Sequence, residues 1–179
     1  MFIVVTGASA SGKSEYAEKR IMELTPKSES AIYIATMQPY GDEGRARVEK
    51  HRRQRAQRRF ETREIYLDME TAEIPKGKNI LLECMSNLAA NEMFARQEPQ
   101  SAAMLKTRII QGIQHLLDCS ENFVAVTNEV FSDTMQYDTQ TLAYIRLLGE
   151  INQALAVLAD EVIEVVYGIP VFIKGGSKA

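Results

Sequence analysis

The sequence predicts an α/β fold of the P-loop nucleoside-triphosphatase type, in which helices flank a mostly parallel sheet. Short apolar runs rich in β-branched residues alternate with segments of helical periodicity, which is the pattern of a parallel sheet covered on both faces. The first apolar run leads directly into the segment GASASGKS at residues 7–14. Two strand-like runs surround a Gly-Ile-Pro turn near the carboxyl terminus, and they predict a C-terminal β-hairpin.

The elements of the first half follow from local apolar patterns. The run FIVV at residues 2–5 is typical of a buried parallel strand, and a helical pattern follows from residue 14 to about residue 24. We expect a second strand over residues 31–36 (AIYIAT) and a third over residues 79–84 (NILLEC). Between these two strands, a basic segment at residues 45–63 is predicted to be helical.

The second half repeats the alternation of helix and strand. Apolar residues at helical spacing predict amphipathic helices over residues 102–117 and 142–159. The run FVAVTNEV at residues 123–130 predicts a strand between these helices. The two strands of the terminal hairpin are expected within residues 161–175.

Length and composition are typical of one soluble globular domain. The 179 residues are 45% hydrophobic and 25% charged, and we expect one P-loop nucleotide-binding domain over residues 1–174 with a disordered tail at residues 175–179. The net charge of -3 and the pI near 5.5 disfavour a general nucleic-acid-binding protein. No apolar run approaches the ~20 residues that span a bilayer, so a membrane partner is not expected.

Two further features predict a cytoplasmic protein. The amino terminus MFIVVTG resembles a strand and has neither a basic region nor a small-residue cleavage site, as a secretory signal would have. The two cysteines, Cys84 and Cys119, lack metal-ligand spacing. We therefore expect reduced, mostly buried thiols in the cytoplasm.

The segment GASASGKS fits the pattern G-x-x-x-x-G-K-[ST] and predicts a phosphate-binding loop. Gly7 and Gly12 let the backbone wrap around phosphates with its amides pointing inward, and the positive end of the following helix dipole adds to the attraction. Lys13 is expected to reach the β- and γ-phosphates, and the Ser14 hydroxyl to ligate Mg²⁺. A chance match is the alternative, but a predicted strand precedes the segment and a predicted helix follows it.

An acidic residue from a neighbouring strand is expected to complete the Mg²⁺ site. Glu83 ends the run NILLE and suits this role. The alternative is an ordinary acid at the end of a strand.

The basic segment RARVEKHRRQRAQRRFETRE, residues 45–64, contains nine of the 21 Lys and Arg residues and one of the two histidines. A solvated helix face, a nucleic-acid patch and a site for phosphate chemistry all fit this composition. A neutral imidazole at His51 could attack an α-phosphate, and Arg47, Arg52 and Arg55 could stabilise the developing charge. The other histidine, His115, lies in an amphipathic helical pattern and is expected to be structural.

Helical spacing divides the arginines of this segment into two stripes. Arg47, His51 and Arg55 are four residues apart, so a helix would place them on one face. Arg45, Arg52 and Arg59 would lie on another face, where we expect them to be only solvated. The first stripe is therefore the candidate for phosphate handling.

Several stretches in order resemble the bifunctional adenosylcobinamide kinase and adenosylcobinamide-phosphate guanylyltransferase family of cobalamin biosynthesis. They are TGASASGKS, YIAT, DEGRARVEKHRRQRA, FETRE, ILLECMSNLAAN, VTNEV, GEINQALAVLADEV and GIPVFIK, and they extend over residues 2–174. The resemblance implies phosphorylation of adenosylcobinamide by a nucleoside triphosphate, followed by transfer of GMP from GTP through a guanylylated histidine. It also implies a P-loop fold, ATP or GTP as substrates, Mg²⁺ and a homotrimer.

The resemblance assigns the family's functional residues to positions of this sequence. The family pattern R-[IV]-x-x-H-x-x-x-R-P corresponds to Arg47, Val48, His51, Arg55 and Ala56, so His51 is the implied nucleophile. The implied nucleotide-contacting residues are Gly7, Ala8, Ser9, Ala10, Ser11, Gly12, Lys13, Ser14, Ala35, Thr36, Met37, Arg52, Arg53, Gln54, Arg55, Glu64 and Glu83.

The chain departs from the family pattern at several positions. Ala8 and Ala10 replace the usual Gly and Arg of the P-loop, and Ala56 and Phe60 replace Pro and Trp. After NEV the family has a glycine-rich G-x-G-x-x-P loop, whereas residues 131–138 read FSDTMQYD, without Gly or Pro. A loop that needs positive φ cannot form in the same way, so acceptor recognition is the activity most open to change.

Two other functions fit parts of the sequence. A small-molecule or nucleotide kinase would use the P-loop and Glu83 without needing His51. A non-enzymatic RNA-binding protein would use residues 45–63 and would bind more weakly as salt rises. The low pI disfavours RNA binding.

Overall fold

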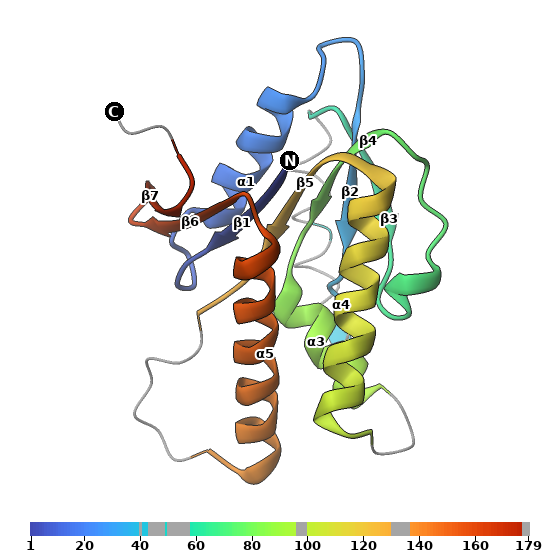
Figure 1. Ribbon diagram of the computed structural model, residues 1–179, viewed down its shortest axis with the longest axis vertical. Coiled ribbons are helices and arrows are strands. Elements are labelled where there is room, and N and C mark those ends of the chain that lie inside the picture. The colour runs from blue at the N-terminus through green and yellow to red at the C-terminus, as the bar shows by residue number, and fades with distance from the viewer. Residues whose placement is uncertain (40, 43–48, 50–57, 96–99, 130–136, 177–179) are drawn as a thin grey trace.

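The structure is a computed structural model that describes residues 1–39, 41–42, 49, 58–95, 100–129 and 137–176 (Figure 1). Strands and helices alternate along most of the chain. The elements are β1 (Phe2–Thr6), α1 (Lys13–Leu24), β2 (Ala31–Ala35), β3 (Phe60–Glu64), the 3-10 helix η1 (Met69–Thr71), β4 (Lys78–Leu82), α3 (Met85–Phe94), α4 (Ala102–Cys119), β5 (Ser120–Val126), α5 (Thr139–Leu158), β6 (Glu161–Val166) and β7 (Ile169–Lys174).

Within the described residues, seven strands form one sheet in the order β3-β2-β4-β5-β1-β6-β7. The strand β1 runs parallel to both of its neighbours, and Val5 lies opposite Val126 of β5 and Ile163 of β6. The pairs β2–β3, β2–β4 and β4–β5 are also parallel, whereas β7 is antiparallel to β6. The loops that follow β1, β2, β4 and β5 therefore meet at one edge of the sheet, which we call the carboxyl edge.

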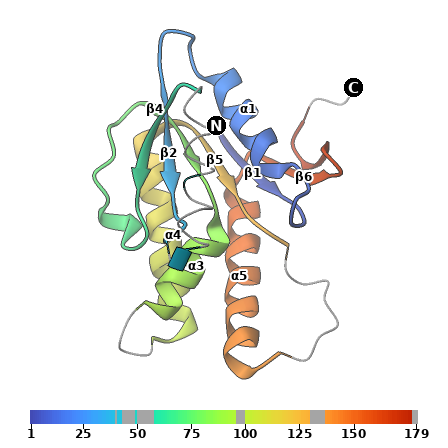
Figure 2. The same ribbon diagram turned by 180° about the vertical axis from the view of Figure 1, so that it is seen from behind.

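Helices cover the two faces of the sheet unequally. The helix α1 packs on one face, and α3, α4 and α5 pack on the other (Figures 1 and 2). Side chains of β1 alternate between the two cores: Ile3 and Val5 face α1, and Val4 belongs to the other core together with Leu148 of α5. Burial on both faces explains why β1 is apolar at consecutive positions.

The predicted fold class and the C-terminal hairpin are confirmed, but the predicted helix at residues 45–63 is wrong at its end. Residues Phe60–Glu64 form β3, which pairs with β2 and is the outermost strand on that side of the sheet. Four of its five residues are exposed, so the sequence FETRE has no apolar pattern that would indicate a strand. Residues 45–48 and 50–57 of the predicted helix, and residues 177–179 of the predicted tail, lie outside the described residues.

The helix α3 was not predicted. It begins directly after β4, and its N-cap is Cys84, which makes no side-chain capping hydrogen bond. Sequence analysis recognises helix starts chiefly from Ser, Thr, Asp or Asn at the N-cap. That signal is missing here, although Leu88 and Ala89 are fully buried against the sheet.

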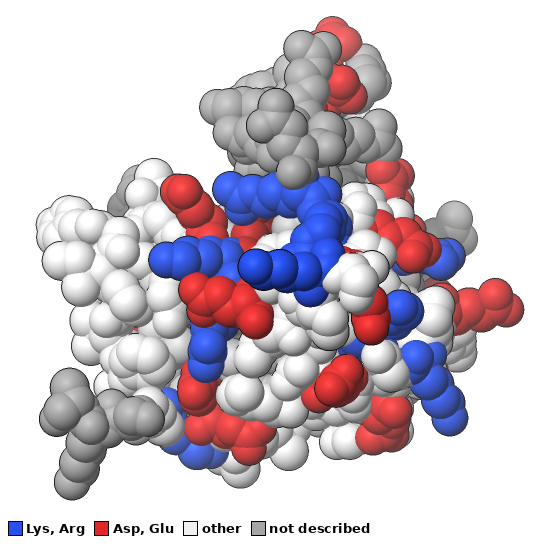
Figure 3. Space-filling model, turned by 90° about the horizontal axis from the view of Figure 1, so that it is seen from above, with Lys and Arg blue, Asp and Glu red and all other residues white. Residues whose placement is uncertain are grey.

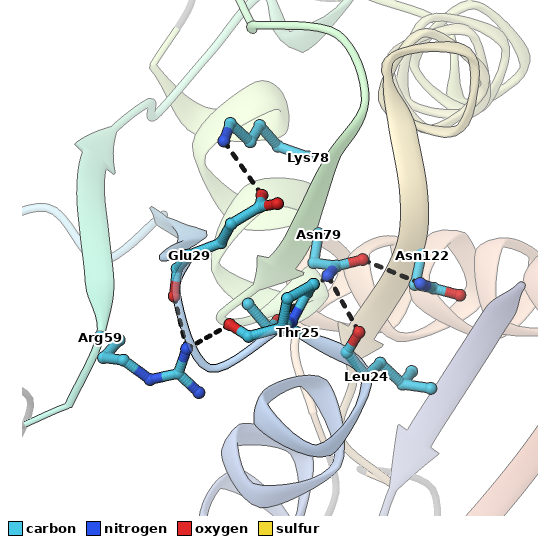
Figure 4. A network of polar contacts seen from close by, with 8 residues as sticks. Leu24, Thr25, Glu29, Arg59, Lys78, Asn79 and Asn122 are labelled. Carbon is cyan, nitrogen blue, oxygen red and sulfur yellow. Dashed lines mark hydrogen bonds and ion pairs between the residues drawn. The ribbon is translucent and has the colours of Figure 1, made fainter.

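The opposite edge of the sheet, the amino edge, is closed by a polar network (Figure 4). The buried Asn79 donates from Nδ2 to Leu24 O at 3.2 Å and to Thr25 Oγ1 at 3.1 Å, and its Oδ1 accepts from Asn122 Nδ2 at 2.8 Å. Arg59 Nη1 donates to Glu29 O at 2.6 Å and also to Pro26 O. Arg59 was expected to be only solvated, and this was wrong, because it joins the start of β3 to the α1–β2 connection.

Charges at the amino edge are of mixed sign. Seen from this side, Lys and Arg side chains lie among Asp and Glu side chains (Figure 3). Ion pairs join Lys78 to Glu29 at 3.2 Å and Arg20 to Glu161 at 3.2 Å. Such a surface attracts a phosphate backbone less than a uniformly basic one does.

Candidate nucleotide-binding site

The segment that follows β1 forms a tight loop before α1. Gly7 has φ 150° and Gly12 has φ 92°. A Cβ at Gly7 would lie 2.6 Å from Val165 O, so no larger residue fits there. The loop is closed by Ser11 N, which donates to Ala8 O at 3.2 Å. Glycine at both positions is therefore a physical requirement of this loop.

Lys13 is the first residue of α1 and lies inside the loop. Its side chain is buried, and Nζ donates to Ala8 O at 3.0 Å. Burial lowers the pKa of the Lys13 ammonium from its ordinary value, and the electrostatic interaction with Cys84 acts in the opposite direction. A buried ammonium in a glycine loop at a helix N-terminus can bind phosphate oxygens.

Glu83 directly follows β4, as predicted, and it contacts the end of β2. Its Oε1 accepts from Tyr33 OH at 3.1 Å, and its Oε2 accepts from Thr36 N at 3.1 Å and Met37 N at 3.4 Å. Glu83 therefore positions Thr36 and Met37, two of the predicted nucleotide contacts. The hydroxyl of Ser14 and the Glu83 carboxylate are both oxygen donors, the type that Mg²⁺ prefers.

Asn91 of α3 holds the loops after β2 and β3 together. Its Nδ2 donates to Thr36 O at 2.9 Å and to Tyr66 O at 3.1 Å. Tyr66 OH in turn donates to Glu64 Oε2 at 2.9 Å, and Glu64 is another predicted contact. Sequence reasoning missed Asn91 because the helix on which it lies was not predicted.

The end of β5 lies beside the P-loop and was also missed. Thr127 N donates to Val5 O at 2.9 Å, which extends the pairing of β5 with β1 toward Gly7. Asn128 Nδ2 donates to Ser86 Oγ at 2.8 Å at the start of α3. The signal was present in the sequence, because the polar residues of VTNEV directly follow an apolar strand.

Cys84 lies between these groups. Asn128 Nδ2 approaches its Sγ at 3.6 Å, and its carbonyl oxygen accepts from Thr36 Oγ1 at 2.9 Å. Burial raises the pKa of the Cys84 thiol, so it is neutral at physiological pH. The environment of Cys84 is thus that of a packed thiol, as predicted.

A cavity of about 380 Å³ lies between α5 and the sheet. Thr6, which precedes the P-loop, and Thr127 line it on the sheet side, and Thr127 Oγ1 donates to Asn152 Oδ1 at 2.7 Å. The remaining lining residues are Val4, Gly149, Gln153, Ala156 and Val162. The cavity has apolar walls with a few polar groups, which suits part of a small molecule.

The structure describes some of the predicted site residues and not others. The P-loop, residues 35–37, Glu64 and Glu83 all lie at the carboxyl edge of the sheet. The predicted nucleophile His51 and its neighbours Arg47, Arg52, Arg53, Gln54 and Arg55 lie outside the described residues. After that segment, Arg58 forms an ion pair with Glu18 of α1. His115 is structural as expected, since its Nε2 lies 2.8 Å from Ala72 O.

Among the described residues, the helices are too short or too polar to cross a membrane. A solved structure, the flagellar accessory protein FlaH from Methanocaldococcus jannaschii, has a similar fold. Its TM-score is 0.53 at 11% identity, with 98% of this chain and 78% of that chain covered. At this identity the likeness concerns the fold alone.

Sequence comparison identifies the family. The bifunctional adenosylcobalamin biosynthesis protein CobU of Salmonella typhimurium is 34% identical over 97% of this chain and 100% of that protein. CobU of Escherichia coli is 35% identical with the same coverage of both chains. A family model described as cobinamide kinase / cobinamide phosphate guanyltransferase matches residues 3–173. The chain therefore belongs to the cobinamide kinase / cobinamide phosphate guanyltransferase family of transferases.

Proposed function

We propose that this protein phosphorylates adenosylcobinamide with a nucleoside triphosphate and then transfers GMP from GTP to the product through a guanylylated His51. The final product is adenosylcobinamide-GDP. The observation that carries the proposal is the P-loop with Lys13 buried inside it, in a chain that matches the family over residues 3–173.

In the phosphorylation step, the aminopropanol hydroxyl of adenosylcobinamide attacks the γ-phosphorus of ATP or GTP. The bond from the γ-phosphorus to its bridging oxygen breaks, the nucleoside diphosphate leaves, and the hydroxyl proton passes to solvent. Lys13 and the first amides of α1 stabilise the charge on the phosphate oxygens. Ser14 and Glu83 would hold Mg²⁺, which supplies further positive charge when it is bound. Glu83 would do so while it also accepts hydrogen bonds from Tyr33, Thr36 and Met37.

In the guanylyl-transfer step, a ring nitrogen of His51 attacks the α-phosphorus of GTP and pyrophosphate leaves. A phosphate oxygen of adenosylcobinamide phosphate then attacks the same phosphorus, and the P–N bond breaks to release His51. Arg47 and Arg55 are proposed to stabilise the charge that develops in both steps. The proposed contacts to the nucleotide are residues 35–37, Arg52, Arg53, Gln54, Arg55, Glu64 and Glu83.

We further infer that the protein acts as a homo-oligomer, a trimer by its resemblance to the family. The strand β7 ends the sheet, and Ile169 is 65% exposed, Ile173 61% and Phe172 48%. Exposed apolar side chains on an edge strand favour burial against another chain. Sedimentation of the pure protein tests this, and a monomer at assay concentration would contradict it.

The experiment that tests the proposed function is incubation with GTP labelled on the α-phosphate. The protein is recovered under denaturing, non-acidic conditions, because phosphoramidates are labile in acid. We expect covalent label on the wild type and none on His51→Ala, which should keep much of its kinase activity because phosphorylation does not use the imidazole. Label on His51→Ala would place the nucleophile elsewhere.

Assays of corrinoid acceptors separate the remaining alternatives. A chain that phosphorylates adenosylcobinamide but takes up no label would be a kinase alone. The sequence of residues 131–138 leads us to expect acceptor kinetics that differ from the family pattern. Kinetics with adenosylcobinamide and related corrinoids test this expectation, and turnover of adenosylcobinamide with the family's ordinary efficiency would contradict it.

A further inference from the structure

The turn between β6 and β7 carries an unusual residue. It consists of Tyr167 with φ 51° and Gly168 with φ 79°. Two successive positive φ values are the pattern of a type I′ hairpin turn, in which Asn-Gly is the favoured sequence. A bulky residue with positive φ is rare, and such outliers gather at functional sites.

The same turn packs directly against the P-loop. Gly168 N donates to Ser11 O at 2.8 Å. A Cβ at Gly12 would lie 3.3 Å from Gly168 Cα, which shows how closely the two backbones approach. Figure 1 shows the β6–β7 hairpin beside β1 and α1. The Tyr167 side chain, which is 94% exposed, therefore projects from a turn that is joined to the phosphate-binding loop.

The strand order indicates which end of a bound nucleotide lies near this turn. Glu83, which is proposed to hold Mg²⁺ near the reacting phosphates, directly follows β4. The strands β5 and β4 lie on one side of β1, and β6 and β7 lie on the other. The reacting γ-phosphate therefore lies toward β4, so the nucleoside, at the opposite end of the triphosphate, lies toward the β6–β7 turn.

We propose that Tyr167 is a stacking platform for the base of the nucleoside triphosphate bound at the P-loop. This proposal rests on the proposed function insofar as the P-loop binds the phosphate donor. A purine presents a large flat face to the phenol ring, and stacking of this kind tolerates different bases. Tyr167 thus contributes affinity for ATP and GTP alike.

The exposed apolar neighbours of Tyr167 suggest another role for this residue, which is contact with a second chain in an oligomer. Val166 and Ile169 flank the turn and are 38% and 65% exposed. Contact with another chain would use these side chains together with Tyr167. Base stacking would need the ring of Tyr167 but not Ile169, so the two roles respond differently to substitution.

The test compares three variants of the full chain by calorimetric titration. Tyr167→Asn removes the ring and gives the favoured Asn-Gly turn, so folding should be preserved. Tyr167→Phe keeps the ring, and Ile169→Asn is the matched control beside the turn. The ligands are ATP, GTP and inorganic tripolyphosphate, which has no base.

We expect Tyr167→Asn to weaken ATP and GTP about tenfold, while Tyr167→Phe and Ile169→Asn bind them like the wild type. Tripolyphosphate should bind all four proteins equally. Unchanged nucleotide affinity in Tyr167→Asn would overturn the proposal. An equal loss of affinity for tripolyphosphate, which has no base, would overturn it too. Tyr167 would then affect binding through the conformation of the P-loop and not through the base. A changed oligomeric state in both Tyr167→Asn and Ile169→Asn, with nucleotide affinity falling in both, would assign the residue to an interface.

A different result of the same titrations would contradict the proposed function. A wild-type protein that binds neither tripolyphosphate nor nucleotide has no working P-loop, and the stacking proposal then falls with it. A wild-type protein that binds both, combined with a neutral Tyr167→Asn, refutes the stacking proposal and leaves the P-loop in place.

Discussion

The two edges of the sheet are both polar, but their polar groups serve different ends. At the amino edge, Asn79 bonds to the end of α1 and to Thr25, and Arg59 bonds to the connection between α1 and β2, so these contacts join structural elements to one another (Figure 4). At the carboxyl edge, Glu83 and Asn91 hold the backbone of residues 36–37 beside a glycine loop. Polarity alone therefore does not identify a site. What differs is whether the network holds loops next to a buried cation such as Lys13.

The largest effect is expected from Lys13→Met, which removes the ammonium at the centre of the carboxyl edge but keeps an unbranched side chain. Kinase turnover should fall about a thousandfold, because a charge at the β/γ-phosphates is lost. A steady-state kinase assay measures this loss. A variant with near wild-type turnover would show that the P-loop does not bind the phosphate donor.

The same variant should be more stable than the wild type at neutral pH. Burial lowers the pKa of Lys13 below the ordinary 10.5, so the charged group opposes folding at every pH below its folded pKa. That penalty fades as the pH rises through the window between the folded pKa and 10.5, where the unfolded chain binds more protons. Thermal unfolding should show a higher Tm for Lys13→Met at neutral pH, with a gain that shrinks in this alkaline window. A lower Tm at neutral pH would contradict this account.

The second prediction concerns Glu83→Gln, which removes the charge of Glu83 but keeps most of its hydrogen bonds. Glu83→Gln can still accept from Thr36 N and Met37 N through its amide oxygen, while its amide nitrogen faces Tyr33 OH. If the carboxylate helps to hold Mg²⁺, kinase turnover should fall about a hundredfold and more Mg²⁺ should be needed. Turnover measured against Mg²⁺ concentration decides the matter.

Glu92→Gln is the matched control for Glu83→Gln. Glu92 is a buried acid of α3 whose Oε1 accepts from Asp68 N at 2.8 Å, and its Oε2 lies 3.6 Å from Arg108 Nη1. This substitution should lower stability without changing the Mg²⁺ requirement. Equal kinetic effects of the two variants would mean that Glu83 acts through folding alone.

The sequence predicted those residues of the candidate site that lie in a local motif or directly after an apolar strand. The P-loop with Lys13 was predicted because it follows an apolar strand and fits a known phosphate-binding pattern, and Glu83 was predicted because it ends another apolar run. Asn91 and Arg59 were missed or misread because their partners, Thr36 and Glu29, are distant in sequence and are brought near only by the strand order. The edge strand β3 was missed because an exposed strand needs no apolar pattern.

The third prediction compares two asparagines with similar bonding. Asn91 Nδ2 donates to Thr36 O and Tyr66 O at the carboxyl edge, and Asn79 Nδ2 donates to Leu24 O and Thr25 Oγ1 at the amino edge. Replacement by Asp removes the donors in both cases and should cost about 1–3 kcal/mol of stability each. Only Asn91→Asp should raise the KM for GTP in guanylyl transfer, by about tenfold, since it releases residues near the proposed nucleotide contacts.

Chemical denaturation and the labelled-GTP assay together test this pair. If the two variants lose similar free energy of unfolding, a difference between their KM values cannot be due to a difference in stability. A raised KM in Asn79→Asp as well would show that the amino edge influences the site. An unchanged KM in Asn91→Asp would show that the loops after β2 and β3 do not need this bridge.

The smallest effect is expected for Arg59→Ala, which removes two hydrogen bonds to carbonyls at the exposed amino edge. Stability should fall by about 1 kcal/mol, because bonds to water replace part of what is lost. Guanylyl labelling should be unchanged, since Arg59 lies at the edge opposite Lys13 and Glu83. The assay has to be run well below the Tm of the variant, so that unfolded protein does not lower the signal. A drop in labelling of the folded protein would mean that anchoring the start of β3 positions the segment that carries His51, and the two edges would then form one functional unit.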